Sequence, residues 1–262
     1  MDLGLRGKTA LVTGGASGIG QAIALALAAE GVDVAIAARR DPADTMAAIE
    51  KRGVRALGLR VDLSRESEAQ RMVEETLAAW GRLDLYVNNA ALAHHQPITR
   101  IDTALWWETL NVNLSACMWA GREIGRHMMS RRQGAILVIG STVTIAPAAR
   151  EAAYRVSKTG LRAYAETLAL EMAPFGIRVN MLTPGAFDTP LLRRSLGDAP
   201  LEGLTAQIPL GRIGQPHECA LAACFLLSDS ASPYTTGAEL FVDGGLRLRP
   251  LSLPDARLQD EQ

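Results

Sequence analysis

The sequence of 262 residues has few cysteines and no long apolar run. Its three cysteines, Cys117, Cys219 and Cys224, form no C-x-x-C pair, so neither a disulfide framework nor a zinc knuckle is supported, and a reducing compartment fits best. The longest apolar run, 219–227, falls far below the roughly 18 residues of a bilayer span. The first residues also lack the pattern of a signal peptide. We therefore expect a soluble, cytoplasmic protein without membrane contact.

An excess of charge of one sign is also absent. Lys and Arg number 27 against 28 Asp and Glu, for a net charge of −1, which excludes a basic surface for nucleic acid or an anionic membrane. Four histidines without ligand spacing predict no metal site. Lysine is scarce among the basic residues and occurs only as Lys8, Lys51 and Lys158. A general bias toward arginine explains the scarcity but not the three positions that remain lysine.

Short apolar runs alternate along the chain with longer stretches of helical periodicity, the pattern of parallel strands joined by crossover helices. We predict an α/β fold: a single doubly wound Rossmann-type domain over 1–245, with a seven-stranded, mainly parallel sheet flanked by helices. A tail at 246–262 is expected at a subunit interface or disordered. The predicted strands are 9–13, 34–38, 55–61, 83–88, 135–140, 177–182 and 239–242.

Three helices are predicted, two of them from signals at their ends. The helix before the fourth strand has helical apolar spacing up to Trp80, with Ser67 and Gln70 as its expected capping box and Gly81 as its end. A later helix is predicted to begin at Pro216, because proline suits the first helical position. Another runs from near Tyr154 to about residue 174.

A glycine turn follows the first expected strand. Gly14, Gly18 and Gly20 are spaced as G-x-x-x-G-x-G and enclose Ser17 and Ile19, just before a helical face. Glycine allows a tight turn and close backbone approach, and the N-terminus of the helix presents free N–H groups to a pyrophosphate. The turn predicts a dinucleotide site, although an ordinary strand-to-helix turn also fits these residues alone.

The end of the second strand bears on the choice of cofactor. An acid is usual there to hold a ribose 2′-hydroxyl, whereas an arginine accommodates a 2′-phosphate. Here Ala38 is followed by Arg39 and Arg40, which favours NADP(H), while Asp41 keeps NAD(H) possible. The alternative is a solvated turn in an arginine-rich chain.

Tyr154 and Lys158 form an i, i+4 pair on one helical face, and Ser141 follows the fifth strand. An ammonium about 4 Å from a phenol supplies about 4 kcal/mol at an effective dielectric of 20, which lowers the phenol's pKa by about three units. Tyr154 is then a usable acid or base, and Ser141 donates a hydrogen bond to the substrate oxygen. An exposed helix pair with a strand-end serine is the alternative interpretation.

The glycine turn, Asn88-Asn89-Ala90-Ala91, Asn113, Ser141, the Tyr154/Lys158 pair and 184–189 occur in one order on one α/β frame. This order resembles that of the short-chain dehydrogenase/reductase family over residues 5–245. The resemblance implies hydride transfer between NAD(P)(H) and a secondary alcohol or ketone, usually in a homotetramer.

The resemblance also implies roles for single residues. Tyr154 is the general acid/base, Ser141 orients the substrate, Lys158 lowers the tyrosine pKa and binds the nicotinamide ribose, and Asn113 holds a helix kink and a proton-relaying water. The implied cofactor contacts are Gly14, Ser17, Gly18, Ile19, Gly20, Arg39, Arg40, Asp62, Leu63, Asn89, Ala90, Ala91, Tyr154, Lys158, Pro184, Gly185, Phe187 and Thr189. Ala91 departs from the family's usual glycine and adds a methyl beside the cofactor.

Segments at the same edge of the sheet suggest the substrate. His94, His95, Arg150 and Glu151 suit a small polar substrate, such as a sugar, polyol or hydroxy acid, although each also fits a solvated loop. An apolar, lid-like stretch near 191–208, which includes Arg193 and Arg194, leaves a 3-oxoacyl-thioester reductase as the alternative. A cofactor-binding regulator or scaffold without activity is the alternative of another class.

Overall fold

The computed structural model describes residues 2–197 and 200–248 and contains one seven-stranded sheet. All seven strands are parallel, in the order β3-β2-β1-β4-β5-β6-β7, which confirms the predicted fold class. The strands are β1 Thr9–Thr13, β2 Asp33–Ala38, β3 Ala56–Arg60, β4 Leu85–Asn88, β5 Gly134–Ile139, β6 Ile177–Pro184 and β7 Glu239–Val242. Of the predicted tail, residues beyond 248 lie outside the described part of the chain.

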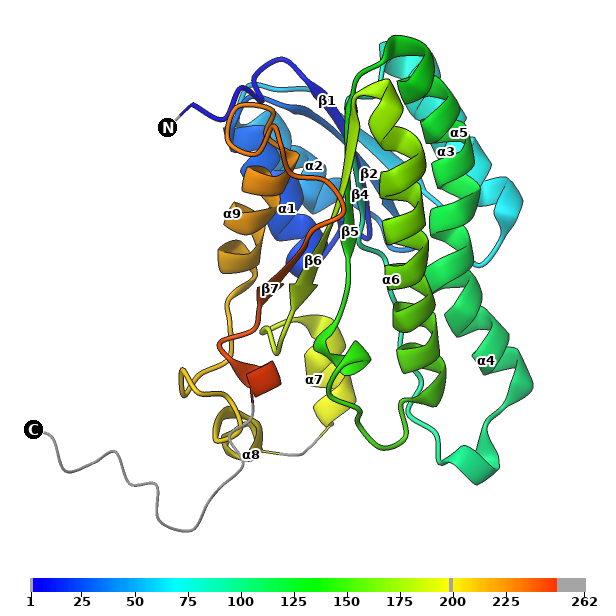
Figure 1. Ribbon diagram of the computed structural model, residues 1–262, viewed down its shortest axis with the longest axis vertical. Helices are drawn as coiled ribbons and strands as arrows, with labels where there is room; N and C mark the ends of the chain where they lie inside the picture. The colour runs from blue at the N-terminus through cyan, green and yellow to red at the C-terminus, as the bar shows by residue number, and fades with distance from the viewer. Residues whose placement is uncertain (1, 198–199, 249–262) are drawn as a thin grey trace, which may run out of the picture.

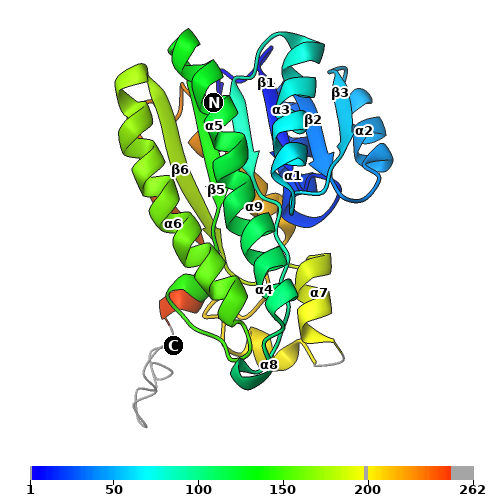
Figure 2. The same ribbon diagram turned by 90° about the vertical axis from the view of Figure 1, so that its right-hand side faces the viewer.

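Helices cover both faces of the sheet (Figures 1 and 2). The helices α3 Glu66–Trp80, α5 Ala116–Arg131 and α6 Ala152–Met172 pack on one face, around Met72, Ile124 and Leu161. On the other face, α1 Gly18–Ala29, α2 Ala43–Glu50 and α9 Pro216–Leu227 pack around Ile23 and Leu27. Because both faces are covered, most strand residues are buried and read as nearly continuous apolar runs.

Three further helices lie toward one end of the sheet. They are α4 Thr103–Leu110, α7 Pro190–Leu196 and α8 Glu202–Thr205. A π-helical turn, Asn111–Ser115, joins α4 to α5. Figure 1 shows α7 and α8 beyond the carboxyl ends of β6 and β5, so they flank the edge at which open α/β sheets bind ligands.

The helix ends confirm one prediction and correct another. Helix α9 begins at Pro216, and the Glu218 carboxylate accepts the Gln215 backbone N–H at 2.7 Å. The capping box predicted at Ser67 and Gln70 is wrong, because α3 begins at Glu66 with Arg65 in the N-cap position and no side-chain cap. Two glutamates in its first turn interact favourably with the helix dipole instead.

No helix in the described residues combines the length and the apolar character needed to cross a bilayer.

Candidate active site

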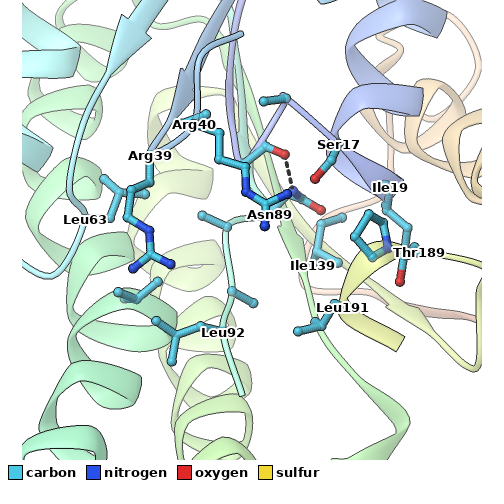
Figure 3. A pocket seen from close by; sticks show the side chains of 18 of the residues that line it. Ser17, Ile19, Arg39, Arg40, Leu63, Asn89, Leu92, Ile139, Thr189 and Leu191 are labelled. Carbon is cyan, nitrogen blue, oxygen red and sulfur yellow. Dashed lines mark hydrogen bonds between the residues drawn. The ribbon is translucent and has the colours of Figure 1, made fainter. Parts of the chain in front are cut away.

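A pocket of about 260 Å³ opens at the carboxyl ends of the central strands (Figure 3). It collects the carboxyl ends of β1 to β6 and the segments that follow them, together with the π-helical turn and the first two turns of α6 and α7. Most predicted site residues line it: Gly14, Ser17, Gly18, Ile19, Arg39, Arg40, Asp62, Leu63, Asn89, Ala90, Ala91, Tyr154, Lys158, Pro184 and Thr189.

The glycine turn brings the start of α1 against the loop after β4. Gly14 and Gly18 have left-handed backbones, with φ of 68° and 57°. A Cβ on Gly20 would lie 2.5 Å from the Gly14 carbonyl oxygen and 2.3 Å from the Asn89 side-chain nitrogen, so only glycine fits. Ser17 is the N-cap of α1, and its side chain makes no capping bond. Free N–H groups of the first turn and the Ser17 hydroxyl are therefore available to an anion.

Thr13 fixes the loop after β4 to the end of β1. Its hydroxyl accepts the backbone N–H groups of Asn89 and Ala90 at 2.9 and 3.0 Å. The Asn89 side-chain amide donates to the Thr13 carbonyl at 2.9 Å. The sequence analysis did not find this role of Thr13, because a threonine at the end of a buried strand has no distinguishing pattern.

Small and apolar residues form the end of the pocket near β2 and β3. Ala37, Ala38 and Val61 line it beside the predicted Leu63. The Asp62 carboxylate accepts the Ser64 backbone N–H at 3.1 Å and the Ser64 hydroxyl at 2.8 Å. Burial raises the pKa of Asp62, but the bonds with Ser64 and nearby arginines outweigh burial and lower it. This carboxyl is therefore ionised at neutral pH.

Lys158 is almost completely buried, with 1% of its surface exposed. Its Nζ donates to the Ile139 carbonyl at 2.7 Å and lies 6.0 Å from the centre of the Tyr154 ring. Burial lowers the pKa of Lys158 to about 8, and Cys117 acts in the opposite sense. The pair is thus brought together on one face of α6, as its spacing predicted.

The pKa of Tyr154 departs from the expectation. Burial raises it to about 12, a hydrogen bond with Ser141 lowers it, and the Glu151 carboxylate raises it. The lowering expected from Lys158 is not found in this structure: its Nζ lies 6.0 Å from the centre of the Tyr154 ring and donates to the Ile139 carbonyl, and burial dominates the pKa of the phenol. Tyr154 is accordingly a protonated phenol at neutral pH.

Asn113 lies in the π-helical turn, which is the kink expected there, and is fully buried. Its side-chain oxygen accepts the Leu92 backbone N–H at 2.9 Å, and its amide donates to the Leu92 carbonyl at 2.9 Å and the Ser157 hydroxyl at 3.0 Å. Asn113 therefore holds the segment after β4 against α6. Its side chain does not line the pocket.

Four other predicted residues also lie outside the pocket lining. Gly20 and Gly185 serve close packing, since a Cβ on Gly185 would lie 2.8 Å from the Asp243 backbone. Phe187 was predicted as a cofactor contact, but its side chain is buried against Gly214 because residues 187 and 214 form a β-bridge. The Ser141 side chain accepts the Val143 backbone N–H at 3.3 Å, and its proximity to the phenol lowers the pKa of Tyr154.

The structure also adds residues to the predicted site. Beyond Ala37, Ala38 and Val61, the added lining residues are Ala16, Leu92, Val112, Ile139, Gly140 and Pro190, together with Leu191 and Arg194 from the expected lid. Most are small or apolar, a type abundant throughout the chain, so composition gave no signal for them. Their place directly after a strand end is the signal that would have found several of them.

Charged side chains pair with one another in the segments that adjoin the lining residues Leu92, Tyr154 and Leu191. His95 Nε2 lies 2.8 Å from the Ser195 hydroxyl, and His95 Nδ1 lies 3.5 Å from a Glu151 oxygen. Burial raises the pKa of Glu151, while His95 lowers it. Arg193 makes two bonds to Asp188, at 2.8 and 2.9 Å. Within residues 2–197 and 200–248, no group of His, Cys, Asp and Glu could hold a metal ion.

Comparisons with known proteins match nearly the whole chain. The family model described as enoyl-(acyl carrier protein) reductase matches residues 14–247. The 3beta-hydroxysteroid dehydrogenase 1 of Eggerthella lenta is 37% identical over 251 residues, covering 94% of this chain and 96% of that protein. The 3-oxoacyl-(acyl-carrier-protein) reductase of Escherichia coli is 36% identical over 244 residues, covering 93% and 99%.

A solved structure from Agrobacterium tumefaciens, described as a 2-deoxy-D-gluconate 3-dehydrogenase with bound NADP, has a TM-score of 0.86 and 33% identity. The match covers 95% of this chain and 99% of that one.

Proposed function

The chain belongs to the short-chain dehydrogenase/reductase family of NAD(P)-dependent oxidoreductases, and from that premise we propose that it interconverts a small polar secondary alcohol and its ketone. The observation that carries the proposal is the Tyr154/Lys158 pair, which lines a pocket at the carboxyl ends of the parallel strands. Tyr154 contributes a phenol and Lys158 a buried ammonium at one site.

The residues of the pocket fit a nicotinamide dinucleotide. Gly14, Gly18 and Gly20 leave space where a Cβ would collide, and the start of α1 offers free N–H groups to a pyrophosphate. Leu63 and Val61 give an adenine an apolar surface, with the Asp62 carboxylate beside it. When bound, the cofactor supplies or accepts the hydride.

In the direction of reduction, Tyr154 donates its proton to the carbonyl oxygen. Its pKa of about 12 keeps the phenol protonated at neutral pH, which is the state that a general acid needs. Lys158 places its ammonium 6.0 Å from the centre of the Tyr154 ring, where it is held by the Ile139 carbonyl. Ser141 lies beside the phenol and orients the substrate oxygen. Asn113 acts as a positioning residue, because it bonds Leu92 and Ser157.

Arg39 and Arg40 favour NADP(H) over NAD(H). Ala38 occupies the position at which NAD(H)-binding folds usually carry an acid, and that carboxylate would repel a 2′-phosphate. Both guanidinium groups border the pocket (Figure 3). The NADP in the A. tumefaciens structure supports this preference. Homotetramer assembly remains a proposal from the family resemblance, and exposed apolar residues such as Trp107 and Leu170 on the outer helices suit it.

The substrate proposal rests on the paired polar residues in the segments that adjoin the pocket lining. His94, His95 and Glu151 offer hydrogen-bond partners to hydroxyl groups, and the A. tumefaciens neighbour is described as a gluconate-type dehydrogenase. A 3-oxoacyl-thioester reductase is the second candidate, because the E. coli relative carries that activity in its name.

The test is a turnover panel of sugars, polyols, hydroxy acids and acyl thioesters, each with NADP(H) and NAD(H). We expect activity on small polar substrates, and exclusive acyl-thioester activity would overturn this proposal. The matched variant is Tyr154→Phe, which keeps the ring and removes the proton donor. It should lower turnover about 10³-fold or more and leave cofactor affinity within about twofold. Undiminished turnover would refute the role of Tyr154, and cofactor binding without turnover across the panel would favour a regulator or scaffold.

A further inference from the structure

Glu108, on α4, contacts two side chains from distant segments: Arg39, which lines the pocket, and His94, which lies two residues beyond the lining residue Leu92. One carboxylate oxygen lies 3.5 Å from Arg39 Nη1, and the other lies 3.0 Å from His94 Nε2. About a third of the surface of the Glu108 and His94 side chains is exposed, whereas Arg39 is 73% exposed. One carboxylate thus links residues that the sequence places in unrelated segments.

The two partners of Glu108 follow different strands, Arg39 after β2 and His94 after β4. Arg39 follows β2, where the cofactor's 2′ position is read, and its side chain extends toward Leu92 and away from Ser17 (Figure 3). His94 lies two residues after Leu92, whose backbone is held by Asn113. Glu108 therefore spans from the adenosine end to the segment on the substrate side.

A 2′-phosphate and the Glu108 carboxylate compete for the same guanidinium. The Arg39–Glu108 contact is single, long and solvent-exposed, and such pairs are weak. A phosphate can engage a guanidinium with two parallel bonds and carries more charge, so it displaces the carboxylate. A 2′-hydroxyl is uncharged and does not compete with the carboxylate, so Arg39 stays paired with Glu108 when such a cofactor binds.

We propose that Glu108 is a specificity-determining residue that sets the affinity for a 2′-phosphate and links the 2′ position to His94. The inference rests on the proposed reading of the 2′ position by Arg39. When a phosphate takes Arg39, Glu108 keeps only His94 as a partner. Linkage is reciprocal, so removal of His94 leaves the whole carboxylate to Arg39 and weakens phosphate binding.

The test is calorimetric titration with adenosine 2′,5′-bisphosphate and with 5′-AMP, which need no substrate. Glu108→Gln should bind the bisphosphate about three- to tenfold more tightly, because a competitor of Arg39 is lost. His94→Ala should bind it about two- to threefold more weakly. Binding of 5′-AMP should stay within about twofold of the wild type in both variants. The two variants should thus change the bisphosphate affinity in opposite directions, although the two residues contact each other. A merely structural role would weaken binding in both.

Two controls locate the effect. Glu75→Gln removes a similar carboxylate that pairs with Arg71 on α3 and does not line the pocket, so it should change neither affinity. In an Arg39→Gln background the Glu108→Gln gain should vanish. Thermal melting of each variant shows that the fold is kept.

The outcomes distinguish this inference from the proposed cofactor preference. If Arg39→Gln binds the bisphosphate as the wild type does, the 2′-phosphate role of Arg39 fails. If Arg39 matters but Glu108→Gln binds the bisphosphate no more tightly than wild type, the Glu108 inference alone fails. If the wild-type chain binds no bisphosphate, the NADP(H) preference fails. In that case measurable bisphosphate binding by Glu108→Gln would support the Glu108 inference, and no binding by that variant would overturn it.

Discussion

Two sets of side chains support the pocket, a buried set that we call the floor and an exposed, charged set that we call the rim, and the two are held by different kinds of bond. The floor side chains are buried and bond the main chain: Thr13 and Asn113, which lie behind the pocket lining, bond Asn89 and Leu92, and Lys158, which lines the pocket, bonds Ile139. The rim side chains bond one another: Arg39 with Glu108, Glu108 with His94, His95 with Ser195 and Glu151, and Arg193 with Asp188.

The two kinds of bond suit different tasks, the buried bonds fixing the groups that react and the exposed bonds influencing which molecules bind. A buried side chain that bonds the main chain has no alternative partner, and its loss leaves a polar group unsatisfied at a cost of about 1–3 kcal/mol. An exposed ion pair contributes about 0–1 kcal/mol and can be exchanged for a ligand. We therefore expect substitutions in the floor to abolish function and substitutions in the rim to adjust which molecules bind.

Lys158→Met gives the largest expected effect. Turnover should fall about 10³-fold or more, because the ammonium beside Tyr154 is lost. Stability should rise by only about 0–2 kcal/mol: burial lowers the pKa of Lys158 from 10.5 to about 8, a cost of about 3 kcal/mol that the methionine removes, but the Ile139 carbonyl loses its donor at a cost of about 1–3 kcal/mol. Urea unfolding and a turnover assay measure the two effects. Lys51→Met, at an exposed position after α2, should change neither, and a destabilised Lys158→Met protein would contradict the prediction.

The stability gain of Lys158→Met should depend on pH in a defined direction. Between about pH 8 and 10.5 the unfolded chain binds a proton at this lysine that the folded chain has released, so wild-type stability rises with pH in this window. Below pH 8 this lysine is charged in both the folded and the unfolded chain, so the wild type bears the whole cost of burying the charge. The difference between variant and wild type should therefore be constant below pH 8 and shrink above it. A difference that grows with pH would show that the charged form is the favoured one.

Gly20→Ala tests the floor through the backbone. The added Cβ would lie 2.3 Å from the Asn89 nitrogen and 2.5 Å from the Gly14 oxygen, so the start of α1 must shift. We expect cofactor affinity to fall about 10–100-fold and stability to fall by about 1–3 kcal/mol, typical of overpacking. Gly203→Ala in α8 is the matched control, because nothing lies within 4 Å of its added Cβ. Calorimetric titration with NADP would contradict this account if both variants bound alike.

The floor was largely predictable from the sequence. Gly14 and Gly18 need left-handed backbones, and Lys158 is one of three lysines in the chain, so residue type and position gave the signal together. The seven strands were found because burial on both faces makes each an apolar run. The start of α3 was misplaced at Ser67, because acidic residues in the first turn replace a side-chain cap.

The rim was not predictable in the same way. Glu108 and Ser195 lie on α4 and α7, 69 residues from Arg39 and 100 residues from His95 in the sequence. Only the folded chain brings such partners together, and glutamate and serine are ordinary on helix surfaces. Phe187 shows the reverse case: its motif predicts a cofactor contact, which stays a prediction, while its ring packs on Gly214 outside the pocket lining. Burial also reversed the expected pKa shift of Tyr154, which spacing alone cannot reveal.

The smallest expected effect is that of His95→Gln on the rim. His95 joins Ser195 on α7 to Glu151 at the start of α6, so its loss loosens the side of the pocket that faces the substrate. The KM of the best substrate in the panel should rise about three- to fivefold, as for one or two lost exposed bonds, with kcat and NADP affinity within about twofold. Ser195→Ala should reproduce part of this change, and His217→Gln, at an exposed position in α9, should have none. A loss of turnover as large as that of Lys158→Met would place His95 in the floor and break the distinction between the two regions.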